Sequence, residues 1–207
     1  MPDSITNQSQ DTSRVERRMR ATRERILHAA LGLFIEKGLE ETTISEITRA
    51  ADVGKGTFFT YFPNKESVLA HVAELLVERM EASARAARAG GGTVHDTLKA
   101  LFRPGIEWHE ANPELSRFLG QAFLRHTAYA EADRSNVGRL ATLVAAEVAD
   151  AQTRGELTRT VPVAQAAIAI FGTYFGSIAA WHIDQRSGGL AALFDGSLGI
   201  VIRGLRR

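Results

Sequence analysis

The chain has 207 residues and no cysteine, so a disulfide framework, a thiolate metal site and cysteine redox chemistry are excluded within it. Apolar residues make up 44% of the sequence and charged residues 24%, a composition typical of a soluble protein that buries a substantial core. The formal net charge is only +1, so any affinity for nucleic acid must come from local clusters of charge. One such cluster exists, because residues 14–25 contain six arginines and two glutamates, a net charge of +4.

Two stretches bear on the location of the protein. Residues 1–13 are polar and lack both an apolar run and a basic leader, so we expect a disordered tail over residues 1–16, no secretion signal and a cytoplasmic protein. Residues 160–181 contain no Asp, Glu, Lys or Arg, and this run of 22 residues is long enough to span a membrane. Its Pro162, its polar side chains, its many alanines and the lack of a polybasic flank favour a helix buried on all sides within protein.

The first half of the chain predicts a helix-turn-helix. A helix is expected over residues 17–37, with Gly38 at its C-cap. The sequence TISE is a capping box, in which the Thr43 hydroxyl accepts from the N–H of Glu46 and the Glu46 carboxylate accepts from the N–H of Thr43. The second helix therefore starts there and ends near Ala51. Three residues then leave room only for a tight turn before KGTFFTYF, so two short helices meet at a steep angle.

The remaining elements are also helical. Pro63 ends the third helix, a fourth is expected over residues 66–89, and AGGG at residues 89–92 is the clearest linker. Pro104 and Gly105 are expected to interrupt the next helix. Further helices are expected near residues 114–128, 134–153, 162–184 and 190–205. No alternating strand pattern longer than four residues occurs, so we predict an all-α fold of about nine helices, with a three-helix domain over residues 17–65 and a second domain over residues 66–207 that helix 66–89 connects to the first.

Four aromatic residues stand close together in KGTFFTYF. In a helix that begins near Lys55, Phe58 and Phe62 are four residues apart and share one stripe, which we expect to pack on Ile47, Ala50 and Leu33. The side chains expected to face outward are suited to DNA, since they combine a cation, hydroxyl groups and aromatic faces: Lys55, Thr57, Phe59, Thr60 and Tyr61. Thr43 and Lys65, at the starts of two helices, are expected to hold flanking phosphates. The alternative is a helical hairpin core with two chance lysines.

Residues 26–69 resemble, nearly position by position, the DNA-binding domain of tetracycline-repressor-type (TetR family) regulators. The matching positions include Phe34, Gly38, Thr43, Ala50, Ala51, Val53, Gly56, Thr57, Phe62, Lys65 and Leu69. The resemblance implies that operator DNA is touched by Thr43, Ser45, Lys55, Gly56, Thr57, Phe59, Thr60, Tyr61 and Lys65. Two positions depart from the pattern, because Gly54 stands where a serine is common and Thr60 replaces a frequent aromatic residue.

The resemblance further implies a homodimer that reads a palindromic operator, and a repressor that a small, largely apolar effector releases, with activation as the alternative. The helix from Pro162 gives an independent reason for a dimer, because a stripe of small residues lies beside a bulky one and small residues permit close helix approach. The predicted interface comprises Phe171, Gly172, Phe175, Gly176, Ala180, Phe194, Leu198 and Val201. The alternative is a core within one chain in which further helices cover both stripes.

An effector pocket is expected in the second domain, lined by Phe102, Trp108, Phe123, Tyr174 and Trp181, although aromatic residues at helical spacing also form ordinary core. His109, His126 and His182 raise the question of a metal or an acid–base site. No HExxH motif, no His pair four residues apart and no cysteine accompany them, so no metal and no cofactor are expected. The repeated Glu-x-x-His of bundle di-iron enzymes and the G-x-S-x-G of serine hydrolases do not occur either, and we expect no enzyme.

Overall fold

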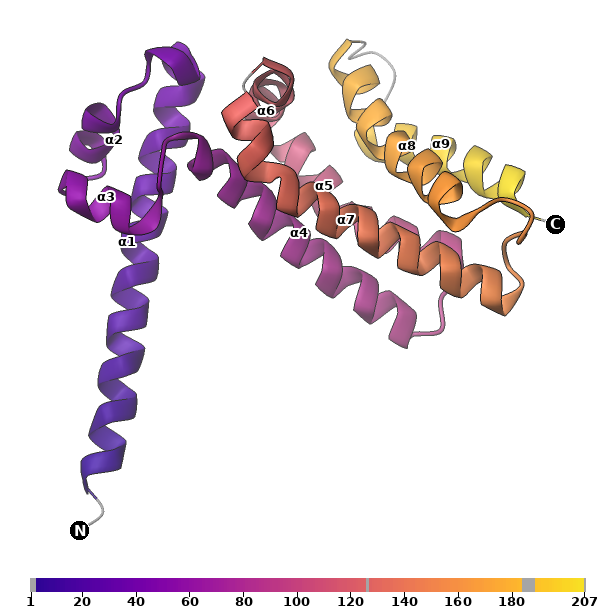
Figure 1. Ribbon diagram of the computed structural model, residues 1–207, viewed down its shortest axis with the longest axis horizontal. Helices are drawn as coiled ribbons and strands as arrows, with labels where there is room; N and C mark the ends of the chain where they lie inside the picture. The colour runs from indigo at the N-terminus through magenta and orange to yellow at the C-terminus, as the bar shows by residue number, and fades with distance from the viewer. Residues whose placement is uncertain (1–2, 126, 184–188, 207) are drawn as a thin grey trace. The chain divides into compact units, whose positions relative to one another are not determined.

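The computed structural model describes the backbone of residues 3–125, 127–183 and 189–206, and the side chains of residues 14–119, 134–183 and 189–206. These residues form nine helices and no strand, so the predicted all-α fold is confirmed (Figure 1). The helices are α1 (Asp3–Glu41), α2 (Ile44–Ala50), α3 (Lys55–Tyr61), α4 (Glu66–Ala89), α5 (Val94–Ala111), α6 (Pro113–Arg125), α7 (Thr127–Arg154), α8 (Val163–Ile183) and α9 (Leu190–Leu205).

The helices separate into two compact units, Met1–Leu69 and Ala70–Arg207. The first unit contains α1, α2, α3 and the first residues of α4, and α2 and α3 pack beside the C-terminal half of α1 (Figure 1). The second unit contains the rest of α4 and α5 to α9. Because α4 begins in one unit and continues in the other, it is the covalent connection between them.

Helix α1 is longer than the predicted helix over residues 17–37 and includes the segment expected to be a disordered tail. Its helical backbone begins at Asp3 and continues to Glu41, across a break at Gly38. Extending an existing helix by one residue costs less than nucleating a new one, so a polar segment can continue a helix that is anchored downstream. Gly38 has φ 88° and ψ 164°, a conformation open almost only to glycine, and the predicted helix end at this position corresponds to that break.

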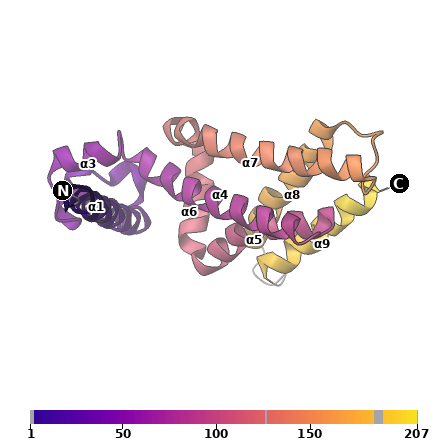
Figure 2. The same ribbon diagram turned by 90° about the horizontal axis from the view of Figure 1, so that it is seen from below.

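The core of the second unit lies among α4, α5, α7, α8 and α9, and α8 packs between α7 and α9 (Figure 2). Its centre is a group of three aromatic rings. The Phe102 ring stacks on Tyr174 with centroids 4.7 Å apart and meets Phe194 edge to face at 5.1 Å. Two ion pairs fasten α4 to α7: Arg88 to the buried Glu147, and Arg139 to Glu81 at 3.0 Å.

The predicted interruption at Pro104 and Gly105 is wrong, because α5 continues through both residues. Proline in a helix interior removes one backbone hydrogen bond, but here both residues are buried in the core and the packing of α5 offsets that loss. Gly105 is needed for contact with the neighbouring helix, since a Cβ atom at this position would lie 2.3 Å from the hydroxyl oxygen of Tyr174. The boundary between α6 and α7 also differs from the expected gap over residues 129–133, where two alanines and one glutamate are strong helix formers.

Within one chain helix α8 is not buried on all sides, so the predicted full burial stays a prediction that needs a second copy to complete it. It is the one helix in the described part of the chain with the length and apolarity of a membrane span, and 28% of its most apolar window is buried. Ala166, Ile170 and Tyr174 face the core, whereas Ile168 and Phe175 are 71% and 44% exposed. Phe194 and Leu198 of α9, predicted to lie in a dimer interface, are instead buried in the core of their own chain. Only neighbouring helices determine which stripe of an apolar helix is covered.

Candidate nucleic-acid interface

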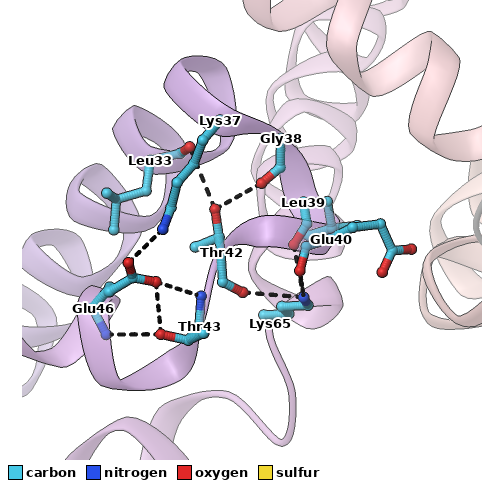
Figure 3. A network of polar contacts seen from close by, with 9 residues as sticks. All are labelled: Leu33, Lys37, Gly38, Leu39, Glu40, Thr42, Thr43, Glu46 and Lys65. Atoms are coloured by element: carbon cyan, nitrogen blue, oxygen red, sulfur yellow. Dashed lines mark hydrogen bonds and ion pairs between the residues drawn. The ribbon is translucent and has the colours of Figure 1, made fainter.

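The start of α2 is held by the predicted capping box (Figure 3). The N–H of Thr43 donates to the Glu46 carboxylate at 2.9 Å, and the N–H of Glu46 donates to the Thr43 hydroxyl at 3.3 Å. The Lys37 ammonium donates to the same carboxylate at 2.5 Å, which ties α2 to α1. Hydrogen bonds from Lys37 and then from Thr43 lower the pKa of Glu46 from 4.5 to about 2. The carboxylate is therefore ionised near pH 7, and Thr43, the predicted DNA contact, lies at the exposed end of this network.

Lys65 occupies an unexpected place. Its ammonium donates to three main-chain carbonyl oxygens, those of Leu39 at 2.7 Å, Glu40 at 3.1 Å and Thr42 at 3.1 Å (Figure 3). An ammonium has three hydrogens, so these carbonyls engage all of its donors. In this structure Lys65 therefore links α4 to the segment between α1 and α2, and its contact with a phosphate stays a prediction. The buried Thr42 stabilises the same segment, because its hydroxyl donates to the carbonyl of Gly38 at 2.7 Å.

Helix α3 is fixed from below by two buried rings, as predicted. Phe58 and Phe62 are 0% and 1% exposed, and their centroids lie 5.8 Å apart. Ile47 is buried beneath them, but Ala50, predicted to join this core, is exposed, and Ala51 is buried in its place. Helix α2 ends at Ala50, so the alanine that packs into the core is the C-cap residue Ala51 and not Ala50.

Arg23 and Asp52 complete the frame of α3, and no sequence motif pointed to either. The Arg23 guanidinium lies 5.6 Å from the centre of the Phe62 ring, within the range of a cation–π contact. Asp52, in the turn between α2 and α3, has φ 52°, the left-handed conformation that Asp tolerates better than most side chains. The Arg23 contact brings a residue of α1 against the C-terminal end of the short helix.

The outer face of α3 presents the predicted mixture of groups. Lys55, Gly56 and Thr60 are exposed, Phe59 is 53% exposed, and Thr57 and Tyr61 are half-buried. The Thr60 hydroxyl donates to the carbonyl of Gly56 at 3.0 Å, so it can still accept a hydrogen bond from a partner. Ser45 is half-buried in the first turn of α2. A cation, hydroxyl groups and an exposed aromatic ring thus share one surface of a helix whose opposite face is immobilised.

The residues predicted to line an effector pocket have different environments in the second unit. Phe102 and Tyr174 belong to the buried aromatic group, and burial raises the pKa of the Tyr174 hydroxyl far above its ordinary value. Trp108 and Trp181 are half-buried, each beside a histidine, with ring centroids 5.2 Å from His109 and 4.7 Å from His182. The side chain of Phe123 lies outside the described residues, as does His126.

A buried serine joins the two histidines, and the sequence carried no signal for it. The Ser116 hydroxyl, 1% exposed, lies 2.7 Å from Nδ1 of His109 and 2.7 Å from Nε2 of His182. Burial and the nearby His182 lower the pKa of His109 to about 4, and burial and Arg117 lower the pKa of His182. Both rings are therefore neutral near pH 7. No group of three or more metal-ligating side chains occurs among the described residues.

Comparisons with known proteins agree with this geometry. Residues 26–72, which contain α2 and α3, match the family model described as "Bacterial regulatory proteins, tetR family". The HTH-type transcriptional repressor KstR of Mycolicibacterium smegmatis is 31% identical over 121 residues, a stretch that covers 58% of this chain and 59% of that repressor. The match thus spans less than two thirds of that relative's length.

Solved structures match over most of the chain. The TetR family repressor FadR of Thermus thermophilus, in complex with lauroyl-CoA, is 29% identical with a TM-score of 0.69, over 89% of this chain and 96% of that one. The regulator FadR of Bacillus subtilis, in complex with stearoyl-CoA, has a TM-score of 0.73 at 22% identity, over 88% and 99% of the two chains, and this likeness shows the fold. Residues 26–72 therefore form a DNA-binding domain of the tetR family of bacterial regulatory proteins, and the helices that the structure describes have the fold of solved TetR family regulators.

Proposed function

We propose that the chain is a cytoplasmic transcriptional repressor that binds a palindromic DNA operator as a homodimer and is released by a small, largely apolar effector. One observation carries the proposal: α3 presents Lys55, Phe59 and Thr60 on a surface that buried rings hold rigid from the other side. Exposed cations and hydroxyl groups on a short helix of a helix-turn-helix are the groups that contact phosphates and base edges.

The homodimer is supported by an apolar face on α8 and α9 that the chain itself leaves uncovered. Ile168 and Phe175 of α8 and Ile200 of α9 are 71%, 44% and 64% exposed. Gly172 and Gly176 are exposed between them, and a Cβ atom at either glycine would meet nothing within 4 Å in its own chain. Bulky apolar side chains beside glycines on adjacent helices suit a two-fold interface of four helices. Phe171, Ala180 and Val201 are half-buried or exposed at the same helices.

The effector is proposed to bind in the second unit and to act through α4. Two solved structures of the same fold contain lauroyl-CoA and stearoyl-CoA, which makes long-chain acyl thioesters the first candidates here. A ligand among the helices of the second unit would change the spacing of two recognition helices, which must fit successive major grooves ~34 Å apart. The coupling must be reciprocal, so DNA weakens effector binding by the factor by which effector weakens DNA binding. Activation from the same site is the alternative outcome.

The DNA-binding proposal is tested by selecting bound fragments from random double-stranded DNA and titrating the selected site at several salt concentrations. We expect a palindrome and an affinity that falls with salt. Phe59→Ala and Lys55→Ala should weaken binding with little loss of stability, because both side chains are exposed, whereas Phe58→Ala should unfold the unit at a cost of roughly 3–5 kcal/mol. The absence of salt-sensitive binding to any duplex would overturn the proposal.

The effector proposal is tested separately with the selected operator. Lauroyl-CoA and stearoyl-CoA are titrated in the presence and absence of DNA, and free coenzyme A serves as the control for the polar part of the ligand. Release of DNA by the acylated compounds alone supports an apolar effector. Equal affinity of an acylated compound with and without operator rules out that compound as the switch.

A further inference from the structure

We propose that the arginine face of α1, defined by Arg14, Arg18 and Arg25, binds the phosphate backbone of duplex DNA beside the site that α3 reads. This inference rests on the proposed function and extends it to a second DNA contact, which is independent of base sequence. None of these three residues lies in the helix-turn-helix segment that carries the predicted contacts.

The three arginines share one side of the helix. They are separated by four and seven residues, spacings that return to nearly the same direction at 3.6 residues per turn, and all three are exposed. Ala30 and Phe34, both 0% exposed, face the core from the opposite side of the same helix. The arginine face therefore points away from the packed interior of the first unit.

Apart from Arg23, which packs on Phe62, residues 14–25 of α1 carry charge and add no buried side chain to the core. The first buried side chain of the described part of α1 is Ile26, and upstream of it even the apolar Val15 and Met19 are 51% and 48% exposed. Figure 1 shows this part of α1 running past α3 within the first unit. Like charges four residues apart, as at Arg14 and Arg18, disfavour a helix slightly. Repulsion between these arginines lowers the stability of the helix, and the packing of this segment does not account for their presence.

Outside residues 14–25, the exposed cations of the first unit are Lys55 and Arg49. Of its three lysines, Lys37 is paired with Glu46, and Lys65 donates to three carbonyls, which leaves Lys55 on the reading face. Charge neutralisation of phosphates supplies most of the sequence-independent affinity for DNA. Arg14, Arg18 and Arg25 therefore add three exposed cations to this unit, on the side of α1 opposite its buried face.

The dimensions suit a duplex. At a rise of 1.5 Å per residue, the helix from Arg14 to Arg25 is about 17 Å long, and DNA presents one negative charge per about 1.7 Å of its axis. Glu16 and Glu24 lie on other sides of the helix at 100° per residue, so they do not neutralise the arginine face. A helix carrying three guanidinium groups in a row along this length can contact several phosphates of one strand.

The experiment compares the full chain with the triple variant R14Q/R18Q/R25Q, because glutamine keeps the helix propensity of arginine. The matched control, R79Q/R85Q/R134Q, removes the same charge from exposed arginines of the second unit. Binding to the selected operator is measured from low to moderate salt, once with long flanks and once with the flanks trimmed to the palindrome.

We expect the triple variant to keep the same preferred palindrome, and its plot of log affinity against log salt to be shallower by about 2–3 per chain, at ~0.9 for each phosphate that an arginine no longer neutralises. Trimming the flanks should weaken the wild type and the control but leave the variant unchanged. A wild-type slope in the triple variant, or an equal change in the control, would overturn the inference. A wild type that binds no duplex at all would overturn the proposed function instead, so the two failures are distinguishable.

Discussion

The Lys65 ammonium donates to the carbonyl oxygen of Leu39 at 2.7 Å, across 26 residues of sequence. Lys65 also donates to the carbonyl oxygens of Glu40 and Thr42. These hydrogen bonds hold the segment that leads into α2. Lys65, one position before α4, thereby holds the start of α2 in place through hydrogen bonds to the backbone of a distant segment.

Lys65→Met should lower the free energy of unfolding of the first unit by about 1–2 kcal/mol, because hydrogen bonds to a charged group are removed and the carbonyls are only partly buried. Lys55→Met, at an exposed lysine without such bonds, is the control and should leave stability unchanged. Hydrogen exchange of the amides of α1 and α2 measures both. Unchanged protection together with a shallower salt dependence of DNA binding would show that Lys65 is a phosphate contact after all.

Gly105→Ala should destabilise the second unit by about 1–3 kcal/mol, because the new methyl group would lie 2.3 Å from the Tyr174 hydroxyl oxygen. In the Tyr174→Phe background, Gly105→Ala should lower the free energy of unfolding by less, because the tyrosine hydroxyl oxygen is absent. Urea denaturation of the wild type, the two single variants and the double variant measures this coupling. Gly138→Ala on α7, where a Cβ atom meets nothing within 4 Å, should be neutral or stabilising. Additive effects of the two substitutions at Gly105 and Tyr174 would contradict the close contact.

Acid should destabilise the second unit through His109. Its pKa is lowered from 6.5 to about 4 in the folded protein, so below pH 6.5 the unfolded state binds the proton more readily. The stability that this neutral ring contributes is present above pH 6.5 and is lost as the pH falls toward 4. Urea titrations followed by the fluorescence of Trp108 and Trp181 should show this loss in the wild type.

His109→Gln is the matched variant for that titration, because glutamine remains neutral at every pH and can still bond to Ser116. The difference between wild type and variant should shrink or reverse between pH 6.5 and 4, while His182, whose pKa is also lowered, adds the same slope to both. A difference that is constant over this range would mean that His109 titrates normally in the folded protein.

Gly176→Leu should convert a dimer into a monomer without unfolding the chain. The glycine is exposed on α8 and its Cβ position is open within the protomer, so a leucine obstructs only an approaching second copy. Gly138→Leu, also open within the protomer but on α7, should leave the assembly intact. Light scattering at micromolar concentration distinguishes the two, and a dimeric Gly176→Leu protein would place the interface elsewhere.

Features set by neighbours along the chain were predictable from the sequence. The capping box of Thr43 and Glu46 involves atoms within four residues, so the same local geometry forms in whatever fold surrounds it. Phe58 and Phe62 had to share a face because they are one helical turn apart, and this spacing fixed which side of α3 is outward. The identification of the DNA-reading helix rests on these short-range relationships.

Features set by contacts between distant segments required the tertiary structure. The role of Lys65 depends on carbonyls more than twenty residues away, and the continuity of α5 through the buried Pro104 depends on the helices that pack around it. On α8 and α9 the sequence shows apolar residues all round, so only the positions of α5 and α8 decide that Phe194 of α9 is core and Ile200 is exposed. The free energy of burial depends on which surfaces meet, and a linear pattern of side chains specifies candidates for contact but not the partner that covers them.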